Sequence, residues 1–274
     1  MICFPNAKIN LGLHILSKRE DGYHNIETVF YPIDLCDALE IVPATERKTV
    51  ITQTGISVDG KPENNLVMKA YRLLKEDFDL PPISIYLRKQ IPVGAGLGGG
   101  SSDAAFMIKL LNDFAGLQLS CEQMEMYAAR IGADCPFFIQ NKPVFAEETG
   151  NVFSPVTISL QGYYLAVIKP SASVSTKEAY AQVKPQQPPA SLKEVIQLPI
   201  NEWKNHLVND FESGVFAQYP EIGEIKQQLY AEGALYAGMS GSGSAVFGIF
   251  DKAVQLENLK FTTYYPKLLQ PAHP

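Results

Sequence analysis

Residues 92–104, PVGAGLGGGSSDA, form a glycine-rich stretch whose composition suits phosphate binding. Glycine at this density weakens the interior of a helix or strand, so it indicates a backbone that must approach another group closely. The apolar spacing that follows predicts a helix beginning near Ser102, with a serine cap and with Asp103 in an acidic first turn. A glycine-rich loop that leads into a helix N-terminus presents free N–H groups and a partial positive charge. These residues therefore predict a phosphate site.

Other interpretations of this stretch fit less well. Flexible linkers mix Gly with Ser over longer runs. The P-loop pattern GxxxxGK[ST] fails because no lysine precedes Ser101. The dinucleotide pattern GxGxxG matches at Gly94, Gly96 and Gly99. However, Pro92 stands where a strand should still be running, so a nicotinamide-dependent enzyme is a weak alternative.

Two further places carry residues that could move a proton. Lys8 and Asn10 share one face of an alternating segment, residues 7–16, whose other face is apolar. The alternation predicts a half-buried strand with Lys8 and Asn10 about 7 Å apart. Asp134 lies in a turn of small residues, followed by Pro136. By themselves, a solvated lysine and a turn aspartate are the ordinary interpretations of these residues.

The elements that would position these residues mix strands and helices without a regular βαβ alternation. Strands are predicted near residues 26–33, 38–42, 49–54, 83–87, 145–147, 163–168 and 245–250, and helices near residues 65–74, 121–131, 208–216 and 220–232. A turn is predicted at residues 21–24, and the proline-rich segment 184–199 is expected to be an exposed excursion. This order favours an α+β fold over a doubly wound sheet. A change in composition near residue 155 favours two domains, residues 1–155 and 156–274.

The composition limits the partners of the chain. The net charge of -6 over 274 residues argues against a nucleic-acid partner, although a nucleotide could still bind in a small basic pocket. The four cysteines form no CxxC pair and have no zinc-site spacing, so we expect buried, reduced thiols in a cytoplasmic protein. Lys8 interrupts the N-terminal apolar run, and no stretch is apolar enough to span a bilayer. No signal peptide and no membrane partner are therefore expected.

Three sequence blocks together resemble the GHMP kinases, the superfamily named for galactokinase, homoserine kinase, mevalonate kinase and phosphomevalonate kinase. The stretch P-x-G-x-G-L-G-G-G-S-S is similar to the second motif of that superfamily, with the proline, the leucine and the paired serines in order. PNAKINL at residues 5–11 and GMSGSG at residues 238–243 are similar to its N-terminal and C-terminal motifs. Further blocks narrow the resemblance to the kinases of cytidine-diphosphate-linked methylerythritol: AKINLGL, DGYH, NNLVMKAYRLL, SSDAA, GADCPFF and VSTKEAY.

The resemblance runs from residue 5 to about residue 250 and implies a two-domain GHMP-kinase fold. A ribosomal-protein-like N-terminal domain would bind ATP, and a ferredoxin-like C-terminal domain would contribute to the substrate site. The implied enzyme transfers the γ-phosphoryl group of ATP to the 2-hydroxyl of 4-(cytidine 5'-diphospho)-2-C-methyl-D-erythritol, in the non-mevalonate route to isoprenoids. Mg²⁺ is the implied cofactor, and a monomer or homodimer is expected. The alternatives are a homoserine or mevalonate type of GHMP kinase and a nucleotide-binding module without catalysis.

The resemblance also assigns roles residue by residue. Lys8 and Asp134 would be the catalytic residues, with Asp134 as general base and Lys8 favouring deprotonation of the acceptor hydroxyl. The ATP side would comprise Asn65 and Lys89, which look like the family's adenine-side contacts, together with Pro92, Gly94, Gly96, Leu97, Gly98, Gly99, Gly100, Ser101 and Ser102. The substrate side would comprise Asn10, Tyr23, His24, Thr176, Tyr180, Ser240 and Gly241. Ser101 or Ser102 could help to place Mg²⁺, but a capping role is equally expected, and no acidic cluster marks a metal cage.

Within the substrate side, Tyr23, His24 and Tyr180 would recognise the cytosine. A tyrosine ring supplies a stacking face, and an imidazole supplies hydrogen bonds to the edge of a base. A sister kinase that acts on homoserine or mevalonate would have no reason to keep this set. The chain departs from the family at Asn151, where an acidic residue is common, and in its short, irregular end after Asp251. Neither departure touches the implied chemistry.

Overall fold

The computed structural model describes residues 1–58, 60–254, 256 and, as backbone, 264–268. The contacts of the chain divide it into two compact units. The first unit contains residues 1–7, 35–93 and 98–142, and the second contains residues 8–34, 94–97 and 143 onward. Each unit is therefore assembled from separated stretches of sequence, and the domain boundary near residue 155 stays a prediction. In the described part of the chain, no helix is both long and apolar enough to cross a membrane.

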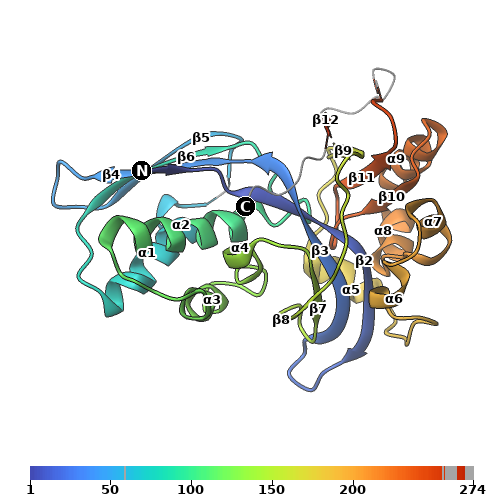
Figure 1. The fold of residues 1–274 in the computed structure, drawn as a ribbon, viewed down its shortest axis with the longest axis horizontal. Coiled ribbons are helices and arrows are strands. Elements are labelled where there is room, and N and C mark those ends of the chain that lie inside the picture. The colour runs from blue at the N-terminus through green and yellow to red at the C-terminus, as the bar shows by residue number, and fades with distance from the viewer. Residues whose placement is uncertain (59, 255, 257–263, 269–274) are drawn as a thin grey trace. The chain divides into compact units, whose positions relative to one another are not determined.

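The first unit is a four-stranded sheet with helices on one face (Figure 1). Its strand order is β1 (Ile2–Cys3), β4 (Ala38–Pro43), β6 (Ile83–Lys89) and β5 (Val50–Gly55). Strands β5 and β6 are parallel, and the other pairs are antiparallel. Its helices are η1 (Pro62–Asn64), α1 (Leu66–Asp77), α2 (Gly99–Ala115), α3 (Cys121–Ala129) and α4 (Phe137–Gln140). Helix α2 packs against the three others and against β1 and β4.

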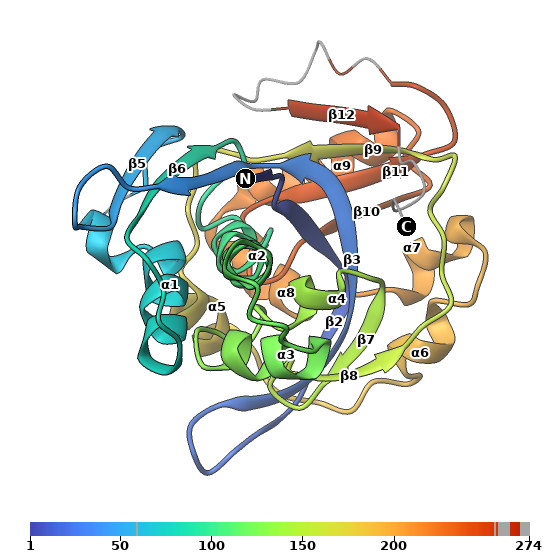
Figure 2. The same cartoon turned by 60° about the vertical axis from the view of Figure 1, so that its left-hand side comes forward.

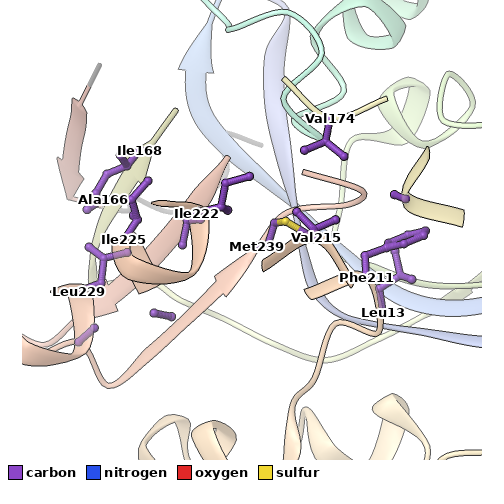
Figure 3. Close-up of a cluster of buried hydrophobic side chains, with 14 of the residues drawn as sticks. Leu13, Ala166, Ile168, Val174, Phe211, Val215, Ile222, Ile225, Leu229 and Met239 are labelled. Atoms are coloured by element: carbon purple, nitrogen blue, oxygen red, sulfur yellow. The ribbon is translucent and has the colours of Figure 1, made fainter. Parts of the chain in front are cut away.

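The second unit contains most of one four-stranded sheet and all of another. The first has the order β2 (Asn6–Lys18), β3 (His24–Cys36), β7 (Val144–Glu147) and β8 (Val152–Pro155). The other has the order β10 (Tyr236–Met239), β11 (Val246–Phe250), β9 (Tyr164–Ile168) and β12 (Tyr264–Leu268), with β12 beside β9 (Figure 2). The helices are α5 (Thr176–Gln182), α6 (Leu192–Val195), η2 (Ile200–Glu202), α7 (Trp203–His206), α8 (Phe211–Gln218) and α9 (Pro220–Ala231). A hydrophobic core joins α8 and α9 to β9–β11 and to Leu13 of β2 (Figure 3).

The mixed order of helices and strands confirms the α+β prediction, and most predicted elements are present. The helix after the glycine-rich stretch differs. Helix α2 begins at Gly99, and Gly98 precedes it in the left-handed region at φ +71° with no side-chain cap. Ser102 therefore lies inside the first turn and Asp103 beyond it, so the predicted serine cap and acidic first turn are wrong. Helix propensity places the start of the helix too late, because glycine is a poor helix former and the first two residues of α2 are glycines.

Strand β2 is buried on both faces, so the prediction of a half-buried strand is wrong. Lys8 is 3% exposed, Asn10 is 2% exposed and His14 is 6% exposed. Alternation identifies which side chains share a face, but it does not reveal whether a polar face is covered. The cost of burying such polar groups is offset when they find hydrogen-bond partners.

Three smaller expectations also differ from the structure. In the proline-rich segment, residues 184–187 are exposed, but Leu192, Val195 and Ile196 are buried through helix α6. Helix α8 begins at residue 211 rather than 208. All four cysteines are free, as expected, but of these Cys135 alone is buried, whereas Cys3 and Cys36 are half-buried and Cys121 is exposed. The irregular end expected after residue 251 includes residues 255, 257–263 and 269–274, which lie outside the described residues.

Candidate functional site

The glycine loop, residues 92–102, has an alternating backbone. Gly94, Gly96 and Gly98 have φ values of +62°, +76° and +71°, in the left-handed region. Ala95 and Leu97 between them are buried. An L-residue in the left-handed region costs about 1–2 kcal/mol, which explains the glycine at every second position. The sequence pattern of the loop thus corresponds to a backbone that is anchored by alternate side chains.

The middle of the loop, residues 94–97, is held within the second unit by hydrogen bonds to its carbonyl oxygens. The Lys8 N–H donates to Leu97 O at 3.0 Å, and the Ala245 N–H donates to Ala95 O at 3.1 Å. The Ser240 Oγ donates to Gly96 O at 2.8 Å. A Cβ atom on Gly96 would lie 1.9 Å from the Ser240 carbonyl oxygen. Glycine is therefore required here by a close backbone approach as well as by its φ value.

Lys8, Asn10 and Ser240 lie together in the second unit. The Lys8 Nζ donates to Asn10 Oδ1 at 2.5 Å and lies 4.9 Å from the centroid of the Phe30 ring. The Asn10 Nδ2 donates to Thr28 Oγ1 at 2.9 Å, and the Asn10 N–H donates to Ser240 Oγ at 3.3 Å. The Lys8 ammonium group is thus oriented by a fixed amide. Gly241 belongs to the same group, since a Cβ atom on it would lie 3.4 Å from Asn10 Oδ1.

The residues expected on the cytosine side lie elsewhere in the second unit. The rings of His24 and Tyr180 are stacked, with centroids 4.6 Å apart and an angle of 19° between their planes. Burial, together with a nearby lysine, lowers the pKa of His24, which favours a neutral imidazole that can donate and accept hydrogen bonds. Tyr23, the residue directly before His24, is 67% exposed. Thr176 Oγ1 lies 3.1 Å from Ser242 Oγ.

Lys89 lies in the first unit between two buried carboxylates. Its Nζ donates to Asp37 Oδ2 and, at 2.7 Å, to Asp103 Oδ2. The Asp37 Oδ1 accepts the Gln90 N–H at 2.5 Å and the Ile91 N–H at 2.9 Å. Burial raises the pKa of Asp103 to about 7, against the attraction of Lys89. This buried ion cluster therefore binds residues on both flanks of the glycine loop, just before Pro92 and just after Ser102.

Asn65, the other residue expected on the adenine side, caps helix α1 in the first unit. Its Oδ1 accepts the Val67 N–H at 2.9 Å, and its Nδ2 donates to Gln53 Oε1 at 3.2 Å. The sequence indicates this cap correctly, because asparagine precedes the first apolar repeat of the helix. The side chain therefore has a structural role whether or not it also contacts a ligand.

The two serines of the loop differ in their surroundings. Ser101 is half-buried, and its hydrogen bond with Cys135 opposes the effect of burial, which raises the pKa of that thiol to about 11. Ser102 is fully buried, and its Oγ has no hydrogen-bond partner among the described residues. Asp134 is half-buried in the turn before helix α4. Lys8 and Asp134 belong to different units, so their pairing stays a prediction.

The sequence analysis did not predict the roles of three buried polar residues: Asp37 and Asp103 in the first unit, and Asn209 in the second. Strand alternation contains a signal for the first two, because Lys89 continues the inward positions of Ile83, Ile85 and Leu87. A lysine on an apolar face requires buried counter-charges. Asn209 could have been noticed as a polar group before helix α8. Its Nδ2 donates to two backbone carbonyls of the second glycine motif of the chain, GMSGSG at residues 238–243.

Two family models match the chain. One, described as the GHMP kinases N terminal domain, matches residues 65–142. The other, described as GHMP kinases C terminal, matches residues 192–261. The first match covers helix α1, the flanks of the glycine loop and Asp134, and the second covers Asn209 and the second glycine motif. Both matches contain residues that the resemblance had assigned to a site.

Relatives and a solved structure are similar to nearly the whole chain. A 4-diphosphocytidyl-2-C-methyl-D-erythritol kinase of Bacteroides fragilis is 59% identical over 263 residues, which cover 95% of this chain and 96% of that protein. One of the same name from Parabacteroides distasonis is 62% identical over 252 residues, covering 92% of each chain. A crystal structure of 4-(cytidine 5'-diphospho)-2C-methyl-D-erythritol kinase has a TM-score of 0.78 at 31% identity, covering 91% of this chain and 90% of that one.

Proposed function

The chain belongs to the 4-diphosphocytidyl-2-C-methyl-D-erythritol kinase family, and we propose that it transfers the γ-phosphoryl group of ATP to the 2-hydroxyl of this family's substrate. It is an ATP-dependent small-molecule kinase with the two-part GHMP-kinase fold. The observation that carries the proposal is the identity of 59–62% over at least 92% of both chains. Such identity to kinases of one name favours their substrate over homoserine or mevalonate.

In this proposal the glycine loop binds the triphosphate of ATP through backbone N–H groups. The N-terminus of the 17-residue helix α2 adds a partial positive charge at the end of the loop. Support comes from the alternating glycines, which leave the backbone of Gly94 and Gly100 exposed while Ala95 and Leu97 are buried. Phosphoryl transfer depends mostly on positioning and on stabilising charge, and a rigid loop supplies the positioning.

The transfer step is assigned to two side chains. Asp134 accepts the proton of the 2-hydroxyl as its oxygen forms a bond to the γ-phosphorus, and the bond from that phosphorus to the bridging oxygen of ADP breaks. Lys8 stabilises the negative charge that develops on the attacking oxygen. The hydrogen bond from Lys8 Nζ to Asn10 Oδ1 supports this role, because it limits the directions in which the ammonium group can point. Asn10 and Ser240 would orient substrate oxygens nearby.

The cytidine part of the substrate is assigned to Tyr23, His24 and Tyr180, with Thr176 beside them. An exposed tyrosine supplies a stacking surface, and a neutral imidazole supplies both a donor and an acceptor for the base edge. In the structure the His24 and Tyr180 rings stack on each other, so one ring must turn to admit a base between them. Base recognition on this side would distinguish the chain from kinases of acceptors without a nucleotide.

The proposal includes Mg²⁺, and the chemistry of the available donors supports it. The described residues contain no group of three His, Cys, Asp or Glu side chains that could hold a metal ion. They do offer the unpartnered Ser102 hydroxyl at the loop, which fits an ion held mostly by phosphate oxygens and water. Mg²⁺ bound there would neutralise charge on the phosphates. Ser101 is the alternative ligand, and its hydrogen bond with Cys135 makes it the less available hydroxyl.

The adenine side and the location complete the proposal. Lys89 is buried between two carboxylates, so it would support the adenine side through strand β6 and helix α2, and Asn65 borders helix α1. The four free cysteines suit a reducing compartment, so the cytoplasm remains the proposed location. A monomer and a homodimer both remain compatible with the proposal.

The test is an ADP-release assay with three acceptors at equal concentration. Cytidine-diphosphate-linked methylerythritol, mevalonate and homoserine are each supplied with ATP and Mg²⁺, and the same reactions are run without acceptor. We expect ADP release above background with the cytidine substrate alone. Faster turnover of homoserine or mevalonate would replace the proposed substrate. ADP release at the same rate with and without an acceptor would mean that the chain only hydrolyses ATP.

The general-base assignment is tested by Asp134→Asn. The variant keeps the shape of the side chain but cannot accept the proton, so kcat is expected to fall by about 10²–10⁴ with little change in the Kd for ATP. Single-turnover kinetics and ATP titration separate the two effects. The matched control is Asp113→Asn, the same change at an exposed aspartate of helix α2 in the same unit. Near-normal turnover by Asp134→Asn would remove this residue from the mechanism.

A further inference from the structure

The second glycine turn, residues 240–245, connects β10 to β11 and carries two residues assigned to the substrate. Inside the turn, the Ser240 N–H donates to Ala245 O at 2.9 Å and the Gly243 N–H donates to Ser240 O at 3.0 Å. Towards the glycine loop, the Ser240 Oγ donates to Gly96 O and accepts the Asn10 N–H. The position of one hydroxyl in this turn therefore affects both the middle of the glycine loop and the strand of Lys8.

Two carbonyl groups of this region accept from a single side-chain amide. The Asn209 Nδ2 donates to Met239 O and to Gly241 O, each at 2.8 Å. The Asn209 Oδ1 accepts the Phe211 N–H at 3.0 Å. Asn209 is only 2% exposed, so both donors and the acceptor of its amide are engaged in a buried place. An aspartate of the same shape could not donate to either carbonyl, which makes the amide group itself the requirement.

Asn209 is in turn held by strand β2. The Leu13 N–H donates to Val208 O at 2.9 Å, and the Asp210 N–H donates to Leu13 O at 2.8 Å. The Asp210 Oδ2 accepts the Ile15 N–H at 2.8 Å. These bonds place Asn209 against the same strand that carries Lys8 and Asn10.

The neighbouring acidic residue of this segment reinforces the same turn. The Glu212 Oε1 accepts the Met239 N–H at 2.8 Å, while its Oε2 pairs with Lys226 Nζ at 2.6 Å. Figure 3 shows that the Met239 side chain packs beside Val215 of helix α8. Both the N–H and the C=O of Met239 are thus bonded to side chains from residues 209–212, directly before Ser240.

We propose that Asn209 is a positioning residue for phosphoryl transfer, which holds the second glycine turn so that Ser240 and Gly241 face the reacting groups. The inference rests on the proposed function. Asn209 acts through the turn and does not touch the substrate. Its effect is on the alignment of groups in the transition state, where a misplacement of about 1 Å costs up to about 10²-fold in rate.

The test uses Asn209→Asp and Asn209→Ser in the full chain. For Asn209→Asp, kcat is expected to fall about 10–100-fold while the KM for the cytidine substrate changes less than about threefold, because alignment rather than binding is lost. Asn209→Ser keeps one donor and should lose less. If the aspartate variant fails to fold, the serine variant decides. The matched control is Tyr230→Phe, which removes another side-chain hydrogen bond to β10, at Ala237 O, and should leave kcat unchanged.

Two further measurements separate positioning from general stability. Amide hydrogen exchange at residues 240–245 should rise in Asn209→Ser and stay unchanged in Tyr230→Phe, whether or not the chain proves active on the cytidine substrate. In a Ser240→Ala background, Asn209→Ser should lower kcat by less than it does alone, because the two residues act through one turn. Unchanged exchange in the turn, or fully additive losses of kcat, would overturn the inference. A wild-type chain without kinase activity would instead overturn the proposed function.

Discussion

The flanks of the glycine loop and its middle are held by different physics. On the flanks, residues 90, 91 and 103 converge on a buried cluster in which one ammonium group lies between two carboxylates. In the middle, residues 95–97 are held by neutral hydrogen bonds to backbone carbonyls. The cluster draws its strength from charges removed from water, and the middle draws its strength from close backbone contact. The flanks should therefore be destabilised when a charge of the cluster is removed. The middle should be disturbed when a larger side chain is introduced.

This contrast suits the two tasks of such a loop. The flanks must hold a strand end and a helix start in place, and a buried charge cluster does so strongly only while every partner is present. In the proposed function the N–H groups of the middle bind phosphate, and the observed hydrogen bonds to its C=O groups suit that role. A peptide group that accepts a hydrogen bond through its C=O still has its N–H available as a donor.

The largest expected effect comes from breaking the charge cluster with Lys89→Met. The substitution leaves Asp37 and Asp103 buried without their cation, and removing one partner of a buried ion pair costs about 3–5 kcal/mol. Urea unfolding measures this loss as a lower free energy of unfolding. Adding Asp103→Asn to the variant removes one uncompensated charge and should recover part of the loss. A decrease below about 1 kcal/mol, typical of exposed ion pairs, would mean that the cluster does not anchor the flanks.

The next effect tests the middle of the loop by adding one methyl group. In Gly96→Ala, the new Cβ would lie 1.9 Å from the Ser240 carbonyl oxygen, so the loop or the second glycine turn must shift. We expect kcat to fall by about 10²-fold, as for other misplacements near 1 Å. The matched control is Gly94→Ala, because φ at Gly94 is also positive, at +62°, but a Cβ there would meet nothing within 4 Å.

The control variant shares only the conformational strain, which is about 1–2 kcal/mol for an L-residue in the left-handed region. Steady-state kinetics and thermal unfolding of both variants therefore separate the effect of backbone strain from the effect of the contact with the Ser240 carbonyl. If kcat falls equally in the two variants, the close approach of Gly96 to Ser240 does not contribute to catalysis. The flanks and the middle of the loop would then differ only in the buried charge cluster at the flanks.

Much of this arrangement can be predicted from sequence, and the remainder fails for identifiable reasons. The cap at Asn65 and the strand of Lys8 are local features, so periodicity and capping rules find them. The start of helix α2 was missed because consecutive glycines hide it from propensity. The counter-charges of Lys89 were missed because Asp37 and Asp103 lie 52 and 14 residues away along the chain. Non-local pairing of this kind leaves only an indirect trace, a lysine at an inward strand position.

The same reasoning explains why Asn209 was not found. Its partners, Met239 and Gly241, are about thirty residues further on and are bonded through their backbone, which leaves no side-chain signature. Leu192 shows the opposite error, since a proline-rich segment suggested exposure where the structure buries the side chain. It lies against Gly12, where an added Cβ would be 2.6 Å from Leu192 Cδ2. Tertiary packing overrides the local pattern in both cases.

The smallest expected effect concerns the charge on Asp103. Burial raises the pKa of this carboxyl from 3.8 to about 7, so the folded protein binds a proton there that the unfolded chain has released between those pH values. The contribution of Asp103 to the free energy of unfolding therefore falls as pH rises from about 4 to about 7 and is constant above that range. Asp103→Asn removes this dependence and keeps an oxygen for Lys89. At pH 7 we expect a change within about 1 kcal/mol, whereas Asp103→Ala should lose about 1–3 kcal/mol through the missing acceptor.

Urea unfolding of wild type and Asp103→Asn at pH 5 and pH 8 measures this difference. The asparagine variant should be more stable relative to wild type at pH 8 than at pH 5, because only wild type carries the second buried negative charge at the higher pH. An opposite sign would mean that Asp103 is stabilised as an anion by Lys89. The flanks of the loop would then be held by a balanced ion network. In that case Asp103→Asn should rescue Lys89→Met more fully, because it then removes a carboxylate that is charged in the wild type.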